Sequence, residues 1–221
     1  GTTVIGNGQE WMAENLRTTR YANGDWIENI EDVSDFLDAT IGAWCHFENN
    51  FGYDGIYGKL YNWYAVDDVR NVCPDGWHVP DTADYGQLLR YLETWNYQND
   101  SWPYIESLNP PSLGTFDMYM SPSGTSDVMV VNQSIWSNQS GQHIAHTANN
   151  ATGLSIFESG SLFGGWDPLP KFWSSTAVPT GSPLPVFQLG VYPLGYSGGW
   201  QSVWFHPIET ADGAAIRCIK D

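Results

Sequence analysis

The sequence contains few positive charges, and this scarcity excludes several classes of function. Of its 221 residues, 8 are Lys or Arg against 25 Asp or Glu, which gives a formal net charge of -17. No Lys or Arg occurs between Arg90 and Lys171. Nucleic-acid binding requires clustered cations that displace counterions, so we expect no nucleic-acid partner. Anionic membrane surfaces should repel the chain for the same reason.

Long apolar runs and a signal peptide are also missing. No segment has 18 consecutive apolar residues, so the sequence predicts no direct membrane insertion. The chain begins at GTTVIGNGQEW without an apolar leader, and we expect a domain cut from a longer precursor.

Motifs that carry catalysis are absent as well. The sequence has no HExxH pair, no GxSxG nucleophile elbow and no glycine-rich phosphate loop. We therefore assign no catalytic residue and no cofactor, and we predict that the protein is not an enzyme. Two facing carboxylates would suffice for a glycosidase, however, and among 25 acidic residues nothing selects a pair.

Metal ligands are sparse. The five histidines are scattered, and structural or solvent-facing roles are favoured over zinc binding. Calcium is a weaker candidate ligand, because oxygen-bearing side chains cluster in a glycine-rich stretch at Glu48, Asn49, Asn50 and Asp54. A solvated turn is the alternative interpretation. The three cysteines, Cys45, Cys73 and Cys218, permit one disulfide and one free thiol.

Aromatic residues are abundant, with 12 Trp, 12 Tyr and 9 Phe beside 23 Gly and 13 Pro. This composition is typical of an ordered protein with many loops. The aromatic segment FQLGVYPLGYSGGWQSVWFH is the best functional candidate, because Tyr and Trp offer large contact areas with few rotatable bonds. Its predicted ligand-binding residues are Phe187, Tyr192, Tyr196, Ser197, Trp200, Gln201, Ser202, Trp204, Phe205 and His206. The alternative is that about half of its aromatic residues pack into the core.

Local patterns predict a mixture of short strands and helices. Asn7-Gly8 predicts a hairpin near the N-terminus, and ANGD at 22–25 predicts a second turn. Apolar spacing predicts helices over 28–41 and 81–95, whereas LYNWYAV fits a buried strand or a short helix. Residues from about 93 to 150 are polar and predict a loop-rich insertion. Strands are expected in ATGLSIF, KFWSSTA and AAIRCIKD.

Four stretches of the chain resemble the Fibrobacter succinogenes major paralogous domain family. They are IGNGQEWMAENLRTTRYANGD, YGKLYNWYAVDDVRNVCPDGWHVPDTADYGQLLRYL, FWSSTA and AAIRCIKD, and WCHFENN is similar to a further segment of that family. The WHVPDTADYGQLL stretch is similar to the helix entry of C-type-lectin-like domains. The resemblance implies a single α+β domain over 1–221 with a C-type-lectin-like fold, in which the N- and C-terminal strands pair.

The resemblance also carries a functional expectation. Lectin-like domains of this kind are frequent targets of diversity-generating retroelements, which vary a C-terminal surface and keep the closing strand. Residues 177–212 depart from the family pattern between two segments that keep it. They are expected to be a variable region of a secreted or surface-displayed adhesin, bacterial or phage-borne, that binds a cell-surface protein or glycan. The alternative is a carbohydrate-binding or carbohydrate-active module of a polysaccharide-degrading bacterium.

The resemblance further implies a disulfide. In a lectin-like fold the strand in NVCPDGWHVPDTADY runs beside the last strand, so Cys73 and Cys218 are expected to meet and Cys45 to stay unpaired. An oxidising compartment would permit the bond. Under this interpretation the segment around His78 holds the scaffold together and is not a catalytic loop.

Overall fold

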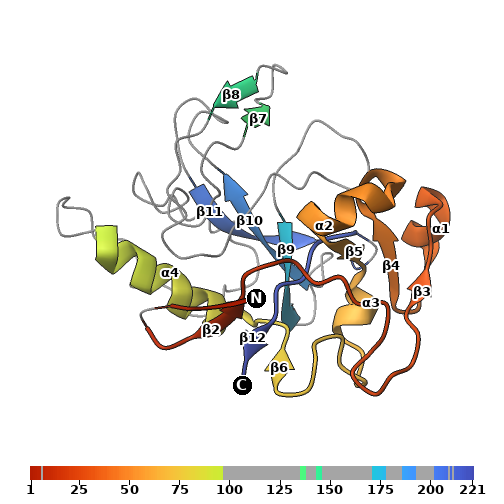
Figure 1. The fold of residues 1–221 in the computed structure, drawn as a ribbon, viewed down its shortest axis with the longest axis horizontal. Coiled ribbons are helices and arrows are strands. Elements are labelled where there is room, and N and C mark those ends of the chain that lie inside the picture. The colour runs from red at the N-terminus through yellow and green to blue at the C-terminus, as the bar shows by residue number, and fades with distance from the viewer. Residues whose placement is uncertain are drawn as a thin grey trace.

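The structure is a computed structural model, and it has an α+β architecture of short helices and open sheets (Figure 1). It describes residues 1–5, 7–96, 135–137, 143–145, 171–177, 186–192, 202–208, 210 and 212–221. Both chain ends lie in the same part of the molecule, as Figure 1 shows. No helix in the described ranges is long and apolar enough to cross a membrane.

A four-stranded sheet joins the two ends of the chain in the order β1-β2-β12-β6. Strands β1 (Thr2–Val4) and β2 (Glu10–Met12) form the expected hairpin, in which Gly8 has the positive φ of 94° that its turn requires. Strand β12 (Ile219–Lys220) lies between β2 and β6 (Trp77–His78), and Ile219 pairs with both Trp11 and His78. The expected pairing of the N- and C-terminal strands is therefore confirmed.

A second sheet has the order β3-β4-β5, and it corrects the predicted helix over 28–41. Strand β3 (Glu28–Asn29) runs parallel to β4 (Ala43–His46), and helix α1 covers only Val33–Asp38. The Asp32 carboxylate accepts hydrogen bonds from the N–H groups of Ser34 and Asp35, which starts the helix there. The apolar spacing at 28–41 thus combines a strand and a helix. After β4, the 3-10 turns η1 (Phe47–Asn49) and η2 (Phe51–Tyr53) lead into the single-turn helix α2 (Asp54–Tyr57).

The LYNWYAV segment contains both of the elements that its sequence allowed. Strand β5 (Lys59–Tyr61) ends at Asn62, and helix α3 (Trp63–Val66) begins directly after it. The fully buried Asn62 accepts hydrogen bonds through Oδ1 from the N–H groups of Ala43 and Ala65. Its Nδ2 donates to the Ile41 carbonyl. One side chain therefore caps α3 and attaches it to β4.

Helix α4 (Thr82–Asn96) confirms the predicted helix over 81–95. Its start is a reciprocal cap, in which the Asp84 N–H donates to the Asp81 carboxylate and the Asp81 N–H donates to the Asp84 carboxylate. Tyr85 and Leu88 are buried at helical spacing, and the Trp11 and Tyr85 rings lie 5.4 Å apart. The helix therefore packs against the sheet that joins the chain ends.

The later part of the chain contains more strands than its composition indicated. Strands β7 (Ile135–Ser137) and β8 (His143–Ala145) pair inside the predicted irregular insertion. Strands β9 (Lys171–Ala177), β10 (Val186–Tyr192) and β11 (Ser202–Ile208) form a third sheet in the order β11-β10-β9. The aromatic segment, predicted as a loop, is thus largely a hairpin. The predicted ATGLSIF strand lies outside the described residues.

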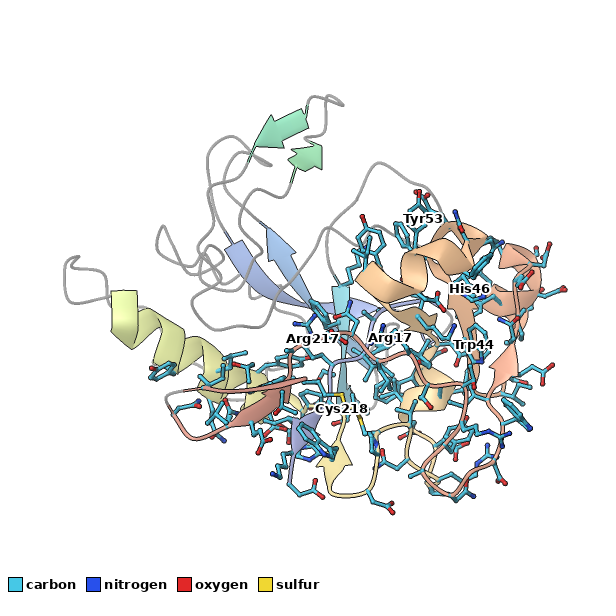
Figure 2. The ribbon with its side chains drawn as sticks, viewed as in Figure 1. Arg17, Trp44, His46, Tyr53, Arg217 and Cys218 are labelled. Carbon is cyan, nitrogen blue, oxygen red and sulfur yellow. A yellow bond between two sulfur atoms is a disulfide. The ribbon has the colours of Figure 1, made fainter. Side chains whose placement is uncertain are left out.

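The two halves of the described chain meet in one hydrophobic cluster. It contains Tyr61, Trp63, Trp173, Ile216 and both disulfide-bonded cysteines, among others. Cys73 and Cys218 are fully buried and joined by a disulfide with a Cα–Cα distance of 6.0 Å, as the family resemblance implied. Figure 2 shows Cys218 at the centre of this junction. Cys45 is buried and free, and burial raises the pKa of its thiol to about 12, so it is not a reactive nucleophile.

A buried arginine connects the closing segment to the N-terminal motif. The Arg217 guanidinium donates to the Asn15 side-chain oxygen and lies 5.3 Å from the Phe172 ring centroid. Burial lowers the pKa of Arg217 to about 10. Asn15 in turn donates from Nδ2 to the Tyr57 carbonyl at 2.8 Å. The family-like stretches EWMAENL and AAIRC are therefore fastened together in the interior.

Candidate functional site

The aromatic segment that the sequence singled out falls on strands β10 and β11. Six of the ten predicted ligand-binding residues belong to these strands, namely Phe187 and Tyr192 on β10 and Ser202, Trp204, Phe205 and His206 on β11. The other four, Tyr196, Ser197, Trp200 and Gln201, lie outside the described residues.

The strand register divides these candidates between the two faces of the sheet. Residues directly opposite each other in an antiparallel pair share a face, and neighbours along a strand alternate. Leu189 pairs with Phe205, whereas Tyr192 pairs with Ser202. Trp204 and Phe205 therefore belong to opposite faces. The register therefore does not place all of these aromatic residues on one face of the hairpin, and which of them reach a ligand stays a prediction.

Strand β9 anchors the hairpin to the core. Trp173 is fully buried, its ring centroid lies 5.8 Å from that of Trp63, and its indole N–H donates to the Tyr61 carbonyl at 2.6 Å. The Tyr85 hydroxyl donates to the Trp173 carbonyl. Through Trp173, β9 contacts α3, α4 and β5, so the position of β9 is fixed on several sides. Strand β10 pairs with β9, and this pairing fixes the position of β10 in turn.

Hydroxyl and backbone groups of FWSSTA bind backbone groups at the start of α4. The Thr176 hydroxyl accepts a hydrogen bond from the Thr82 N–H at 2.9 Å, and the Ser175 N–H donates to the Pro80 carbonyl at 2.8 Å. These contacts join the end of β9 to the start of α4 across 94 residues. We conclude that Thr176 helps to cap helix α4.

Two of the four calcium candidates, Asn50 and Asp54, have side-chain oxygens engaged in other hydrogen bonds. The Asn50 side-chain oxygen accepts from the Gly52 N–H, and Asn49 donates from Nδ2 to the Glu31 carbonyl. Both carboxylate oxygens of Asp54 are engaged, as described below. In the described part of the chain, no group of three or more His, Cys, Asp and Glu residues is placed to hold a metal ion. The arrangement fits the alternative interpretation, a turn, better than a calcium loop.

Asp54 is instead the centre of a partly buried polar cluster that sequence reasoning missed. Its two carboxylate oxygens accept hydrogen bonds from Lys59 Nζ at 2.5 Å and from His46 Nδ1 at 2.7 Å. The Lys59 ammonium also lies 3.9 Å from the centroid of the Trp44 ring. Figure 2 shows Trp44 and His46 on the same part of the molecule. Because the Lys59 side chain is only 7% exposed, its charge needs these partners, and the cluster stabilises β4 against β5.

His78 connects strand β6, on which it lies, to helix α4 and to the C-terminal residue. Its Nδ1 lies 2.7 Å from the Asp221 carboxylate, and its Nε2 lies 3.1 Å from the Asp84 carboxylate. Burial disfavours the charged imidazole, but the hydrogen bonds to Asp221 and Asp84 outweigh that effect and raise the pKa of His78. Both ring nitrogens thus face carboxylates, which connects β6 to α4 and to the last residue of the chain. The contacts of His78 give it a structural role, and its lack of a catalytic role stays a prediction.

The raised pKa of His78 predicts a pH-dependent contribution to stability. A group whose pKa is higher in the folded state stabilises the fold below its unfolded pKa, and this contribution disappears as the pH rises through the folded value. We expect the melting temperature of the wild type to exceed that of His78→Gln most at about pH 5.5, and the difference to shrink towards about pH 8.5.

Calorimetry of the two proteins across this range measures the effect. Asp221→Asn should flatten most of the dependence, because it removes the closer of the two carboxylates. A difference between wild type and His78→Gln that grows with pH would contradict the assignment.

The sequence matches the model of a known protein family. The family model described as Fibrobacter succinogenes major domain matches residues 4–220, which is nearly the whole chain. No curated protein and no solved structure matches the sequence.

Proposed function

This chain belongs to the Fibrobacter succinogenes major domain family, and on that premise we propose that it is a noncatalytic ligand-binding module, secreted or displayed on a cell surface, that binds a protein or glycan. The binding surface is one face of the β10–β11 hairpin. The proposal includes a C-type-lectin-like fold and an extracellular location. It also includes diversification of residues 177–212 by a retroelement, for which a near-copy of their coding DNA beside a reverse-transcriptase gene is the test.

The observation that carries the proposal is the chemical difference between the two faces of the hairpin. The register places one entirely apolar set of residues together, consisting of Phe187, Leu189, Val191, Val203, Phe205 and Pro207. The other face is mixed and holds Val186, Gln188, Gly190, Tyr192, Ser202, Trp204, His206 and Ile208. Beside β9 both faces are buried, since Gln188 pairs with Trp173 and Leu189 pairs with Phe172. Towards β11, an apolar face favours packing and a mixed face favours exposure. Tyr, Trp and Ser are also the residues that binding surfaces favour.

This division refines the list of ligand contacts. Phe187 and Phe205 are assigned to packing, whereas Tyr192, Ser202, Trp204 and His206 are assigned to the ligand. The rest of the sheet can support ligand binding by the hairpin. Contacts of Trp173 and Tyr85 fix β9, whereas β11 lies at the edge of the described sheet. A rigid support lowers the entropy lost when a surface binds its ligand.

Two neighbouring substitutions test the proposal. The probes are a glycan array and whole bacterial cells, and the readouts are affinity and melting temperature. Trp204→Ala should weaken binding about 30-fold or more, the effect of removing a central aromatic contact, with the melting temperature nearly unchanged. Phe205→Ala should lower the free energy of unfolding by about 3 kcal/mol and leave the affinity of the folded fraction intact.

The matched pair makes the outcomes distinct. Equal effects of both substitutions on affinity, or the reverse pattern, would contradict the assignment of faces. Chemical turnover of a bound polysaccharide would overturn the noncatalytic proposal and favour the carbohydrate-active alternative.

A further inference from the structure

A second surface lies far along the chain from the hairpin, on the turns that follow β4. Phe51 is 79% exposed and Ile56 is 50% exposed, and both belong to the short η2–α2 segment. Half-buried Tyr53 and Tyr57 lie between them in the sequence. We call these four residues, Phe51, Tyr53, Ile56 and Tyr57, the Phe51 face. Figure 2 shows Tyr53 at the outer end of this part of the molecule.

The Phe51 face rests on a packed aromatic base. The ring centroid of buried Phe47 lies 4.7 Å from that of Tyr57 and 5.7 Å from that of Tyr53. The two tyrosine rings are themselves 5.7 Å apart. These contacts connect the face to the small core around Phe36 and Leu60. Exposed apolar residues on such a rigid base offer contact area without a large entropic cost of ordering.

Hydrogen bonds and unusual backbone conformations hold the preceding turn in place. Glu48 and Asn49 both have φ of 51°, in the left-handed region that non-glycine residues seldom adopt. Asn49 donates to the Glu31 carbonyl at 2.6 Å, and Asn50 accepts from the Gly52 N–H at 2.9 Å. The turn thus presents Phe51 in a defined position beside the start of α1.

The stretch of sequence that contains the Phe51 face is acidic. Between Arg20 and Lys59 the sequence has no Lys or Arg. The same interval contains the acidic residues Asp25, Glu28, Glu31, Asp32, Asp35, Asp38, Glu48 and Asp54. Of these, Asp54 is neutralised by Lys59, and Asp25 is paired with Arg70. Glu48 directly precedes the segment and Glu31 lies beside it, because Asn49 binds the Glu31 carbonyl, so the face has acidic neighbours.

We propose that the Phe51 face docks a segment of a partner protein that carries apolar side chains flanked by Lys or Arg. Charge decides between the possible occupants. A second copy of this chain would bring two acidic surfaces together, and an anionic membrane would repel the face. A cationic, apolar segment satisfies both the exposed rings and the surrounding carboxylates. This surface is separate from the β10–β11 hairpin, and the proposal does not depend on what the hairpin binds.

Selection from a displayed library of random 15-residue peptides tests the proposal. From the peptides that bind the wild type, those that also bind a Phe51→Ser/Ile56→Ser variant are removed. The remaining peptides, the survivors, are sequenced, and their affinities are measured by calorimetry. We expect survivors rich in Lys, Arg, Leu and Phe, with affinity reduced about tenfold or more by the double substitution and by high salt. Both substituted side chains are exposed, so the melting temperature should be preserved.

The matched control is Val69→Ser, which changes a fully exposed apolar residue on another turn and should leave binding unchanged. Equal loss of binding in that variant would show nonspecific attraction to an acidic protein and overturn the proposal. Survivors that are acidic or uncharged would also overturn it, as would failure to recover any discriminating peptide. A homodimer that Phe51→Ser dissolves, or cosedimentation with phosphatidylglycerol vesicles that it abolishes, would assign the face to a different occupant.

Discussion

Replacing Cys73 and Cys218 with alanine is expected to lower the free energy of unfolding by about 2–5 kcal/mol, the largest effect that we anticipate from any pair of substitutions in this chain. The bond joins residues 145 positions apart, so its loss releases a very long loop in the unfolded state. Both cysteines are fully buried in the cluster that contains Trp63, Trp173 and Ile216. Chemical denaturation of the wild type and the double variant measures the difference.

Two controls separate the cross-link from the loss of sulfur atoms. Cys45→Ala removes a buried thiol that forms no disulfide and should cost about 1 kcal/mol. A reductant should destabilise the wild type and the Cys45 variant but leave the Cys73/Cys218 double variant unchanged. Undiminished stability of the wild type after complete reduction would show that the disulfide contributes nothing.

Gly58→Ala is expected to lower the free energy of unfolding by about 3 kcal/mol or more, from backbone strain and overpacking together. Gly58 has φ of 72° and ψ of -156°, a conformation that is almost restricted to glycine. A Cβ at this position would lie 2.6 Å from the Asn15 Cβ and 2.8 Å from the Leu16 carbonyl oxygen. Neither neighbour is free to move, because Asn15 binds buried Arg217 and the Leu16 carbonyl accepts from the Lys59 N–H.

Two other glycines allow the two causes to be measured separately. Gly8 also has a positive φ, but a Cβ there would meet nothing within 4 Å. The loss of stability in Gly8→Ala therefore measures the cost of backbone strain alone. Gly55 lies in α2 with open space and no positive φ, and Gly55→Ala should be close to neutral. A Gly58→Ala variant no less stable than Gly8→Ala would contradict the close approach of Asn15.

Local sequence patterns were sufficient where a structural element depends on its own residues. Tyr85 and Leu88 at helical spacing behind Asp81 predicted α4, and Asn7-Gly8 predicted the first hairpin. The Cys73–Cys218 disulfide came from the family resemblance, because three cysteines alone do not select a pair.

Patterns failed where an element depends on a distant partner. Strand β3 forms because Glu28 and Asn29 pair with Ala43 and Trp44, which no spacing within 28–41 reveals. The glycines and prolines of 177–212 concealed β10 and β11, whose ladders to each other and to β9 are nonlocal. The oxygen-rich run at 48–54 suggested calcium, whereas only the structure shows that Lys59, five residues further, binds the Asp54 carboxylate.

The candidate binding residues were recognised by type but not by arrangement. The aromatic content of 187–206 selected the segment on which the proposal rests, and the alternative that about half of its aromatic residues pack inward stays a prediction. Only the pairing of Leu189 with Phe205 and of Tyr192 with Ser202 indicates which half. A period-2 pattern is difficult to see in one strand that also contains Gly190 or Pro207.

The position of the disulfide bears on how the protein would respond to proteases. Almost everything after α3 lies between Cys73 and Cys218, including Arg90, Lys171 and the whole β10–β11 hairpin. A single tryptic cut after Arg90 or Lys171 would therefore leave both fragments covalently attached. The nicked chain would migrate as one species without reductant and as two with it. For a domain exposed to extracellular peptidases, the disulfide would keep both fragments attached after a single cleavage.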